Sequence, residues 1–340
     1  MDRRTFAVAG VSSLATLTAA PARIPIAIAG GSHSHASAKS AILRDSPEWE
    51  LLGVWEEDPE LCKKYESEKI RILSKDQVFG GPARVVAVEG PVKDHFTFSL
   101  KALESGKHVH VEKPPADTME GMRRLVEVAR KKNQLLQSGY MWRYHPGFDK
   151  VLEASRNGWL GDIYMVRGQI NTLIDASRRP EWGMFKGGQM FELGAHLIDA
   201  LVRLLGTPAK VTPFLRKQGG YNDDLRDNTI AVFEYPRALA VIQSATLQPG
   251  AGTHRSFEVL GTNGTAVIRP LEAPVLTFDL AKPAGPYKKG TQTVPLPTYK
   301  RYEGDLADLA AAVRGEKKLV VSLDDELRIH QTLMAASDMI

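Results

Sequence analysis

Residues 23–31 read Arg-Ile-Pro-Ile-Ala-Ile-Ala-Gly-Gly, an apolar run that stops at two glycines. A short continuous apolar run is typical of a strand buried on both faces, and paired glycines favour a tight turn after it. Residues 32–43 then have a helical pattern, and a second apolar run, Leu51–Trp55, ends in the acidic residues 56–58. This order predicts the first strand, turn, helix and strand of a nucleotide-binding sheet.

The same alternation continues as far as residue 140. Three further strands are expected at Arg84–Val88, His108–Val111 and Leu135–Ser138, and helices at residues 94–105 and 119–132 separate them. Strands that alternate with helices predict a parallel sheet covered on both faces. We therefore expect a doubly wound Rossmann domain over residues 23–140.

The glycine turn departs from the usual dinucleotide fingerprint. Gly30 fits the first position of G-x-G-x-x-G, whereas Ser32 and His35 stand at the other two. Glu56 follows the second strand, where a carboxylate binds the ribose hydroxyls of NAD and repels the 2′-phosphate of NADP. NAD is therefore expected rather than NADP, although a charged surface loop is another interpretation of Glu56. The other expected cofactor contacts are Ser32, His33, Glu89, Gly90, Pro91, His95, Glu112 and Lys113.

A lysine stands at the end of the fourth strand. Lys113 is followed by Pro114, which restricts the backbone beside it. Ligands of open α/β sheets bind at the carboxyl ends of strands, so we expect Lys113 to orient a substrate hydroxyl or to help remove its proton. A surface lysine after a strand is the alternative interpretation.

A polar stripe follows in a predicted helix, Gln189–Leu205. Its spacing places Glu192, His196, Asp199 and Arg203 on one helical face, and apolar residues fill the other positions. A histidine beside carboxylates suits proton transfer near neutral pH. A histidine packed in the core and a metal chelated by Glu192 and His196 are alternatives, and the site predicted here contains no metal.

The two motifs together resemble the Gfo/Idh/MocA family, which includes glucose–fructose oxidoreductase and inositol dehydrogenase. The resemblance rests on Glu112-Lys113-Pro114 and on the later Gly-Gly helix with carboxylate-x-x-x-His-x-x-Asp, supported by residues 139–146 and 261–265. It implies catalytic roles for Lys113 and His196 around the reacting carbon, with Glu192 and Asp199 beside them. The family usually has Asp at the position of Glu192.

Residues 141–340 have a different pattern. Apolar runs separated by turns predict an α+β domain with a large, mostly antiparallel sheet. Arg143, His145, Trp182 and His196 are the expected substrate contacts. Helices at residues 305–314 and 324–339 are expected to pack back on the Rossmann domain, and the face of the sheet is expected to form a homo-oligomer.

The bulk composition fits a two-domain soluble protein. The chain has 340 residues, of which 43% are hydrophobic and 25% charged. The net charge of +4 is spread along the chain without a basic run, so nucleic acid is not an expected partner. The single cysteine, Cys62, excludes an internal disulfide framework and a multi-cysteine metal site.

The first 22 residues have the layout of a twin-arginine signal peptide. Arg3-Arg4 precedes Thr5-Phe6 and an acid-free apolar run, and Ala20-Pro21-Ala22 offers small residues for cleavage. The run is shorter than the ~20 residues that span a bilayer, so no membrane partner is expected. The protein is expected to be periplasmic or secreted, with a cytoplasmic N-terminal helix as the alternative.

These features predict an NAD-dependent oxidoreductase that transfers hydride from a small sugar, polyol or sugar derivative. One alternative is a glycoside hydrolase or lyase that uses tightly bound NAD for transient oxidation and elimination. A second is a sugar- or nucleotide-binding protein without catalysis, in which Lys113 and His196 are incidental.

Overall fold

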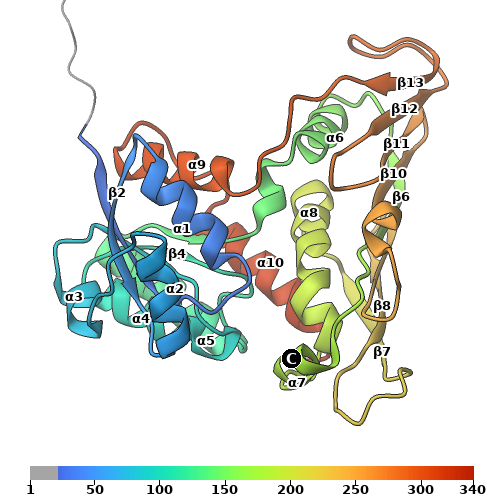
Figure 1. The fold of residues 1–340 in the computed structure, drawn as a ribbon. Coiled ribbons are helices and arrows are strands. Elements are labelled where there is room, and N and C mark those ends of the chain that lie inside the picture. Colours follow the sequence, from blue (N-terminus) through green and yellow to red (C-terminus); the bar gives the residue numbers. More distant parts are fainter. Residues whose placement is uncertain (1–21) are drawn as a thin grey trace, which may run out of the picture.

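The computed structural model describes residues 22–340, so the expected signal peptide, apart from Ala22, lies outside the described residues. Two sheets dominate the fold (Figure 1). The first is parallel, with the strand order β2-β1-β3-β4-β5. Its strands confirm the predicted Rossmann sheet and are β1 (Ile24–Ala29), β2 (Trp49–Trp55), β3 (Val85–Val88), β4 (His108–Val111) and β5 (Leu136–Ser138).

Helices cover both faces of this sheet, and the side chains of β1 show why its sequence is continuously apolar. Ile26 and Ile28 pack in one cluster with α1 and α9, whereas Ala27 and Ala29 pack on the other face with α3, α4 and α5. Successive strand residues point to opposite faces, so both faces need apolar side chains. The helices are α1 (Ala36–Asp45), α2 (Pro59–Ser67), α3 (Lys75–Gly80), α4 (His95–Glu104), α5 (Met119–Lys132) and α9 (Glu303–Val313).

The second sheet has the order β13-β12-β11-β10-β6-β9-β8-β7, in which only β6 and β9 pair in parallel. This confirms the predicted mostly antiparallel sheet. Its last two strands were not predicted, and the second of them, the edge strand Gly290–Val294 (GTQTV), is largely polar. The strands are β6 (Ile163–Gln169), β7 (Lys210–Arg216), β8 (Asn228–Glu234), β9 (Leu239–Ala245), β10 (Ser256–Gly261), β11 (Gly264–Ile268), β12 (Leu276–Leu280) and β13 (Gly290–Val294).

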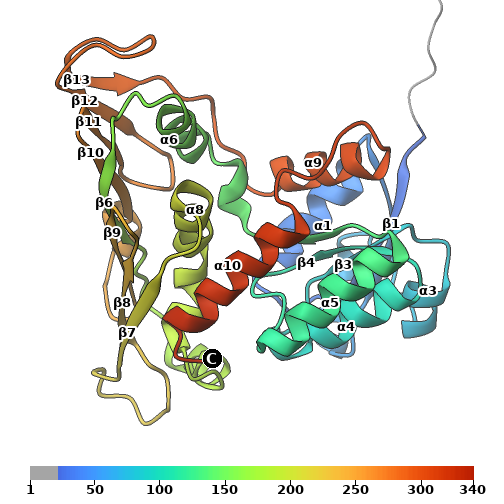
Figure 2. The same ribbon diagram turned by 180° about the vertical axis from the view of Figure 1, so that it is seen from behind.

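One face of the second sheet packs on helices that lie between the two sheets (Figures 1 and 2). They are α6 (Pro146–Arg156), α8 (Ala195–Leu205) and α10 (Leu323–Ala336). In the described part of the chain, no helix covers the opposite face. Helix α10 contacts both α5 and α8, and α9 packs on β1, as expected of the two C-terminal helices. None of the helices in residues 22–340 is both long and apolar enough to cross a membrane.

Two helix starts differ from expectation, and both lie beside the strand ends. Helix α1 begins at Ala36 rather than at Ser32, because residues 32–35 form a turn from which His35 reaches Glu112. The helix predicted over 189–205 begins with a π-helical segment, Met190–Gly194, before α8. Such wide turns are frequent at functional sites.

Candidate active site

The two motifs that the sequence singled out meet between the domains. The Nζ atom of Lys113, just after β4, donates to Glu192 Oε1 at 2.6 Å and to the Glu192 carbonyl oxygen at 2.8 Å. The side chains of Lys113 and Glu192 are 2% and 10% exposed, so this is a buried ion pair. The π-helical segment carries Glu192 into this contact. The longer side chain of glutamate, where the family usually has aspartate, therefore reaches the strand-end lysine.

His196 lies one helical turn further along, at the start of α8. Its ring packs against Trp142 and Tyr140, with centroid distances of 5.3 and 6.1 Å, and Nδ1 has no hydrogen-bond partner among residues 22–340. Burial, reinforced by the charge of Lys113, holds the pKa of His196 well below its ordinary value. The ring is therefore neutral near pH 7 and able to accept a proton. The metal alternative for Glu192 and His196 loses support, since Glu192 Oε1 is engaged by Lys113.

A line of hollows runs along the carboxyl ends of β1, β2 and β3. The outer hollow is lined by Gly30, Ser32 and Glu56 among others, and the inner one by Ser32, His33, Trp182 and Glu192 among others. A third hollow, also lined by Ser32, lies against Pro91 and Met184. These hollows extend from the expected ribose position to the Lys113–Glu192 pair, which is the course that a dinucleotide takes on this fold.

The residues at the outer end fit a dinucleotide. Gly30 has a φ of +73°, and a Cβ atom there would lie 2.6 Å from the Cα of Gly90, so glycine is required where the two turns touch. Glu56 lines the hollow as predicted, while its Oε2 accepts the N–H of Gly31 at 2.6 Å. Glu56 therefore holds the glycine turn as well as facing the expected ribose site.

A buried lysine that the sequence analysis did not predict lies behind the strand ends. Lys39 Nζ donates to Glu89 Oε1 at 2.8 Å and to Glu112 Oε1, and it lies 2.7 Å from His110 Nε2. The signal in the sequence was its position on the buried face of α1, with Ala36, Ser40 and Leu43. Glu89 and Glu112 are two of the expected cofactor contacts, and their side chains are fully buried against this lysine.

Burial and the charge of Lys39 shift the pKa values of Glu89 and Glu112 in opposite directions. Burial raises the pKa of Glu89 to about 8 in spite of the opposing effect of Lys39. Burial also opposes the ionisation of Glu112, but Lys39 and His35 together bring the pKa of Glu112 well below its ordinary value. Glu112 is therefore the charged partner of Lys39 at neutral pH.

Four predicted site residues are held in structural contacts and are not brought to the hollows. Arg143 donates to Asp199 Oδ1 at 2.8 Å and to Glu326 Oε1 at 2.6 Å, and all three side chains are buried. These two carboxylates compensate the charge of Arg143, so neither Arg143 nor Asp199 is positioned to bind a sugar.

His145 and His95 are also held by hydrogen bonds within the protein. His145 Nδ1 accepts the N–H groups of Gly147 and Phe148 at the start of α6, and its Nε2 lies 2.8 Å from the Leu271 carbonyl oxygen. The ring nitrogens of His95 lie 2.8 and 3.0 Å from the carbonyl oxygens of Pro114 and Gly90. His95 thus links the ends of β3 and β4 and does not itself line the hollows.

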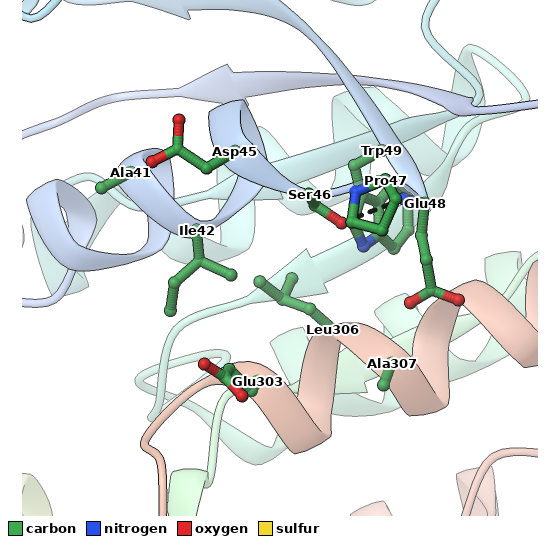
Figure 3. A pocket seen from close by; sticks show the side chains of 10 residues that line it. All are labelled: Ala41, Ile42, Asp45, Ser46, Pro47, Glu48, Trp49, Glu303, Leu306 and Ala307. Atoms are coloured by element: carbon green, nitrogen blue, oxygen red, sulfur yellow. Dashed lines mark hydrogen bonds between the residues drawn. The ribbon is translucent and has the colours of Figure 1, made fainter.

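A separate hollow lies between α1, α9 and the segment before β2 (Figure 3). Asp45, Glu48 and Glu303 are its acidic side chains, and Glu48 N donates to Ser46 Oγ at 3.1 Å. It lies at the amino end of β2, whereas open α/β sheets bind ligands at the carboxyl ends of strands. This hollow is therefore not a candidate for the reaction.

Two dehydrogenases of known substrate are similar to part of the chain. The protein is 37% identical to a D-glucoside 3-dehydrogenase of Escherichia coli over 37% of this chain and 36% of that protein. It is 27% identical to a scyllo-inositol 2-dehydrogenase (NADP⁺) of Bacillus subtilis over 53% of this chain and 51% of the relative. The matched region thus spans about a third to a half of the length of these curated relatives.

Solved structures match almost the whole fold. GenD2 of gentamicin A biosynthesis, solved in complex with NAD, has a TM-score of 0.79 and 21% identity, covering 93% of this chain and 94% of that one. An aldose–aldose oxidoreductase from Caulobacter crescentus, complexed with glycerol, has a TM-score of 0.78 and 21% identity, covering 93% and 98%. At 21% identity, these matches show a shared fold and do not show a shared substrate.

Two family models account for most of the chain. The model described as the oxidoreductase family with an NAD-binding Rossmann fold matches residues 24–140, and the GFO/IDH/MocA C-terminal domain matches residues 148–267. The matches cover the first sheet and the second sheet without β12 and β13, and they include Lys113, Glu192 and His196. The chain belongs to the Gfo/Idh/MocA family of oxidoreductases.

Proposed function

We propose that the protein is an NAD-dependent oxidoreductase that acts on a hydroxyl-bearing carbon of a sugar, polyol or sugar derivative. The observation that carries this proposal is the buried Lys113–Glu192 contact at 2.6 Å, beside a histidine whose Nδ1 has no partner among the described residues. A lysine and a neutral histidine at the end of a cofactor groove can hold a hydroxyl oxygen and take its proton. The dehydrogenases among the relatives act on compounds of this class by name.

Each residue of the site has a distinct task in the oxidation direction. The Lys113 ammonium donates a hydrogen bond to the substrate hydroxyl oxygen, and Glu192 keeps the ammonium in place. His196 accepts the hydroxyl proton at a ring nitrogen, because its lowered pKa leaves the ring neutral. The acceptor for the hydride of the same carbon would be supplied by NAD bound in the groove beside Gly30 and Glu56. Trp182, at the inner hollow, shields the site from water.

NAD is the proposed cofactor rather than NADP. Glu56 and Glu57 both line the outer hollow, and two carboxylates there disfavour a 2′-phosphate. Titration of the cofactor-free protein with each dinucleotide tests this choice. Equal or tighter binding of NADP would contradict it.

The activity is tested with the protein purified from its native host and a panel of free sugars, polyols and glycosides. Reduced nicotinamide that accumulates in proportion to oxidised product is the expected result. Glycoside cleavage without added NAD and without net reduction would instead assign the protein to hydrolysis or elimination with a retained cofactor. Absence of both reactions over the whole panel, in protein that binds NAD, would contradict the proposed class.

We also propose that the uncovered face of the second sheet forms a homo-oligomer. Phe214 is 49% exposed there and is paired with Ile230, while Val232 and Val241 are opposite each other on β8 and β9. Apolar side chains left exposed on an uncovered sheet face are typical of a subunit interface. Light scattering on wild type and on Phe214→Lys tests this, and a wild-type monomer would contradict it.

A further inference from the structure

Two histidines and one carboxylate converge on the wall of the cofactor groove. His35 Nδ1 lies 3.1 Å from Glu112 Oε1, and His33 Nδ1 lies 3.9 Å from Glu112 Oε2. One ligand atom from each of the three residues fits within 4.8 Å of the others. The side chains of His33, His35 and Glu112 are 7%, 17% and 0% exposed, so all three are largely buried.

The distances suit a transition-metal ion. Zinc binds histidine nitrogen and carboxylate oxygen at about 2.0–2.2 Å, so two ligand atoms of a tetrahedral site lie roughly 3.3–3.6 Å apart. His33 Nδ1 and Glu112 Oε2 lie 3.9 Å apart, and His35 Nδ1 lies 3.1 Å from the other carboxylate oxygen, Oε1, so rotations of the carboxylate and of the two rings bring three ligand atoms into that range. Two histidines and one carboxylate on one side of an ion also leave positions for oxygen ligands.

A neighbouring group of two glutamates and one histidine shares Glu112 with this site. Glu89, His110 and Glu112 also lie within coordinating distance of one another, further inside the domain. The ammonium of Lys39 contacts all three of these side chains. The inner group therefore has a cation supplied by the chain. His33 and His35 belong to the outer group, and no lysine or arginine of the described residues forms an ion pair or hydrogen bond with either ring.

The charge around this region favours a further cation. Glu89, Glu112 and Asp305 are all buried, and both carboxylate oxygens of Asp305 lack a hydrogen-bond partner within residues 22–340. Two buried lysines lie in this region: Lys39 contacts Glu89 and Glu112, and Lys113 is paired with Glu192. With a pKa of about 8, Glu89 is neutral near pH 7, so Glu112 and Asp305 carry the buried negative charge against the single charge of Lys39, and a divalent ion on Glu112 offsets the difference.

We propose that His33, His35 and Glu112 form a binding site for a divalent transition-metal ion such as Zn²⁺, Mn²⁺ or Co²⁺. From the sequence we expected no metal, and the alternative metal site lay at Glu192 and His196. The ion binds through His33 Nδ1, His35 Nδ1 and Glu112 Oε2, while Oε1 keeps its contact with Lys39. Binding replaces two contacts: the hydrogen bond from His35 N to His33 Nδ1 at 3.3 Å, and that between His35 and Glu112.

The site faces the substrate end of the groove. His33 lines the same hollow as Ser34, Trp182 and Glu192. The remaining coordination positions of an ion at His33 therefore point to the side where a polyol or sugar would lie, and vicinal hydroxyl oxygens suit them. The metal site goes beyond the proposed oxidoreductase activity and does not depend on it.

Metal binding is measured directly on full-length protein that has been stripped with a chelator. Equilibrium dialysis against Zn²⁺ and the visible absorption of bound Co²⁺ report stoichiometry and ligand type. We expect one ion per chain, and loss of more than about tenfold in affinity for His33→Ala and for His35→Ala. His254→Ala is the matched control, because His254 is exposed and lies in the second domain, and it should bind like wild type.

Circular dichroism of each variant checks the fold, and His35→Gln takes the place of His35→Ala if that variant is unfolded. Wild-type protein that binds neither Zn²⁺ nor Co²⁺ overturns the proposal, as does unchanged binding by the folded variants. NAD-linked turnover is assayed separately in the stripped protein. Turnover without metal binding would reject the metal site and leave the oxidoreductase proposal standing.

Discussion

Lys113→Met separates the chemical role of the lysine from its structural one. In the wild type, Lys113 and Glu192 are 2% and 10% exposed and their charged atoms lie 2.6 Å apart. The methionine variant keeps the Glu192 carboxylate buried but removes its cation. Removal of one partner of such a pair typically costs about 3–5 kcal/mol, so we expect the free energy of unfolding to fall by about that amount.

The double variant Lys113→Met, Glu192→Met removes both charges. Replacement of a buried pair by apolar groups of similar size is often nearly neutral, so most of the lost stability should return. Turnover should be absent from both variants, because neither has an ammonium to hold the substrate oxygen. A stable but inactive double variant would therefore assign Lys113 to the chemistry and not only to packing.

The assay combines urea unfolding, followed by circular dichroism, with nicotinamide reduction on the best substrate of the panel. Lys186→Met is the matched control, since Lys186 is 63% exposed and pairs with Asp338 at the surface. It should change the free energy of unfolding by no more than about 1 kcal/mol. Unchanged stability of Lys113→Met would refute the buried pair, and near wild-type turnover in the double variant would refute the role of Lys113.

Three further predictions follow from the contacts of single residues. His196→Asn should lower kcat by about 10²–10⁴-fold. The pKa of His196 is lowered, so protonation should inactivate the wild type only well below pH 6.5, and a pH–rate profile should show that acid limb in the wild type and not in the variant. Glu56→Gln should raise the affinity for NADP relative to NAD by about tenfold or more in dinucleotide titrations, and an unchanged ratio would remove Glu56 from cofactor choice. Arg143→Met should cost about 3–5 kcal/mol in urea unfolding, because Asp199 and Glu326 lose their cation, while KM of the folded enzyme stays within about twofold. A large rise in KM with unchanged stability would return Arg143 to the substrate site.

The strand ends show how far a sequence pattern can define a site. Glu56 and Lys113 come directly after apolar runs, and the parallel sheet brings such positions to one edge whatever the intervening loops do. Glu192 and His196 were predictable from helical spacing against an apolar background. The structure places these side chains along one line of hollows or beside it.

Arg143 and His145, at the domain junction, show where prediction of a site from local sequence patterns fails. Arg143 and His145 follow the Rossmann domain in the sequence, and the family resemblance brought attention to them. Their partners are Asp199, Glu326 and the carbonyl group of Leu271, which lie between 56 and 183 residues away along the chain. A local pattern does not reveal such partners, so it does not tell whether a polar side chain remains free for a ligand.

The sequence by itself determined the Rossmann and sheet domains and the residues Lys113, Glu192 and His196, because strand and helix periodicities are local properties of the chain. The tertiary structure decided which polar groups are engaged in the interior. It placed Lys39 between Glu89 and Glu112, paired Asp199 with Arg143, and turned His33 and His35 toward Glu112. Burial of a charge is stable only with a partner at hydrogen-bond distance, and that distance is set by packing between segments that are remote in the sequence.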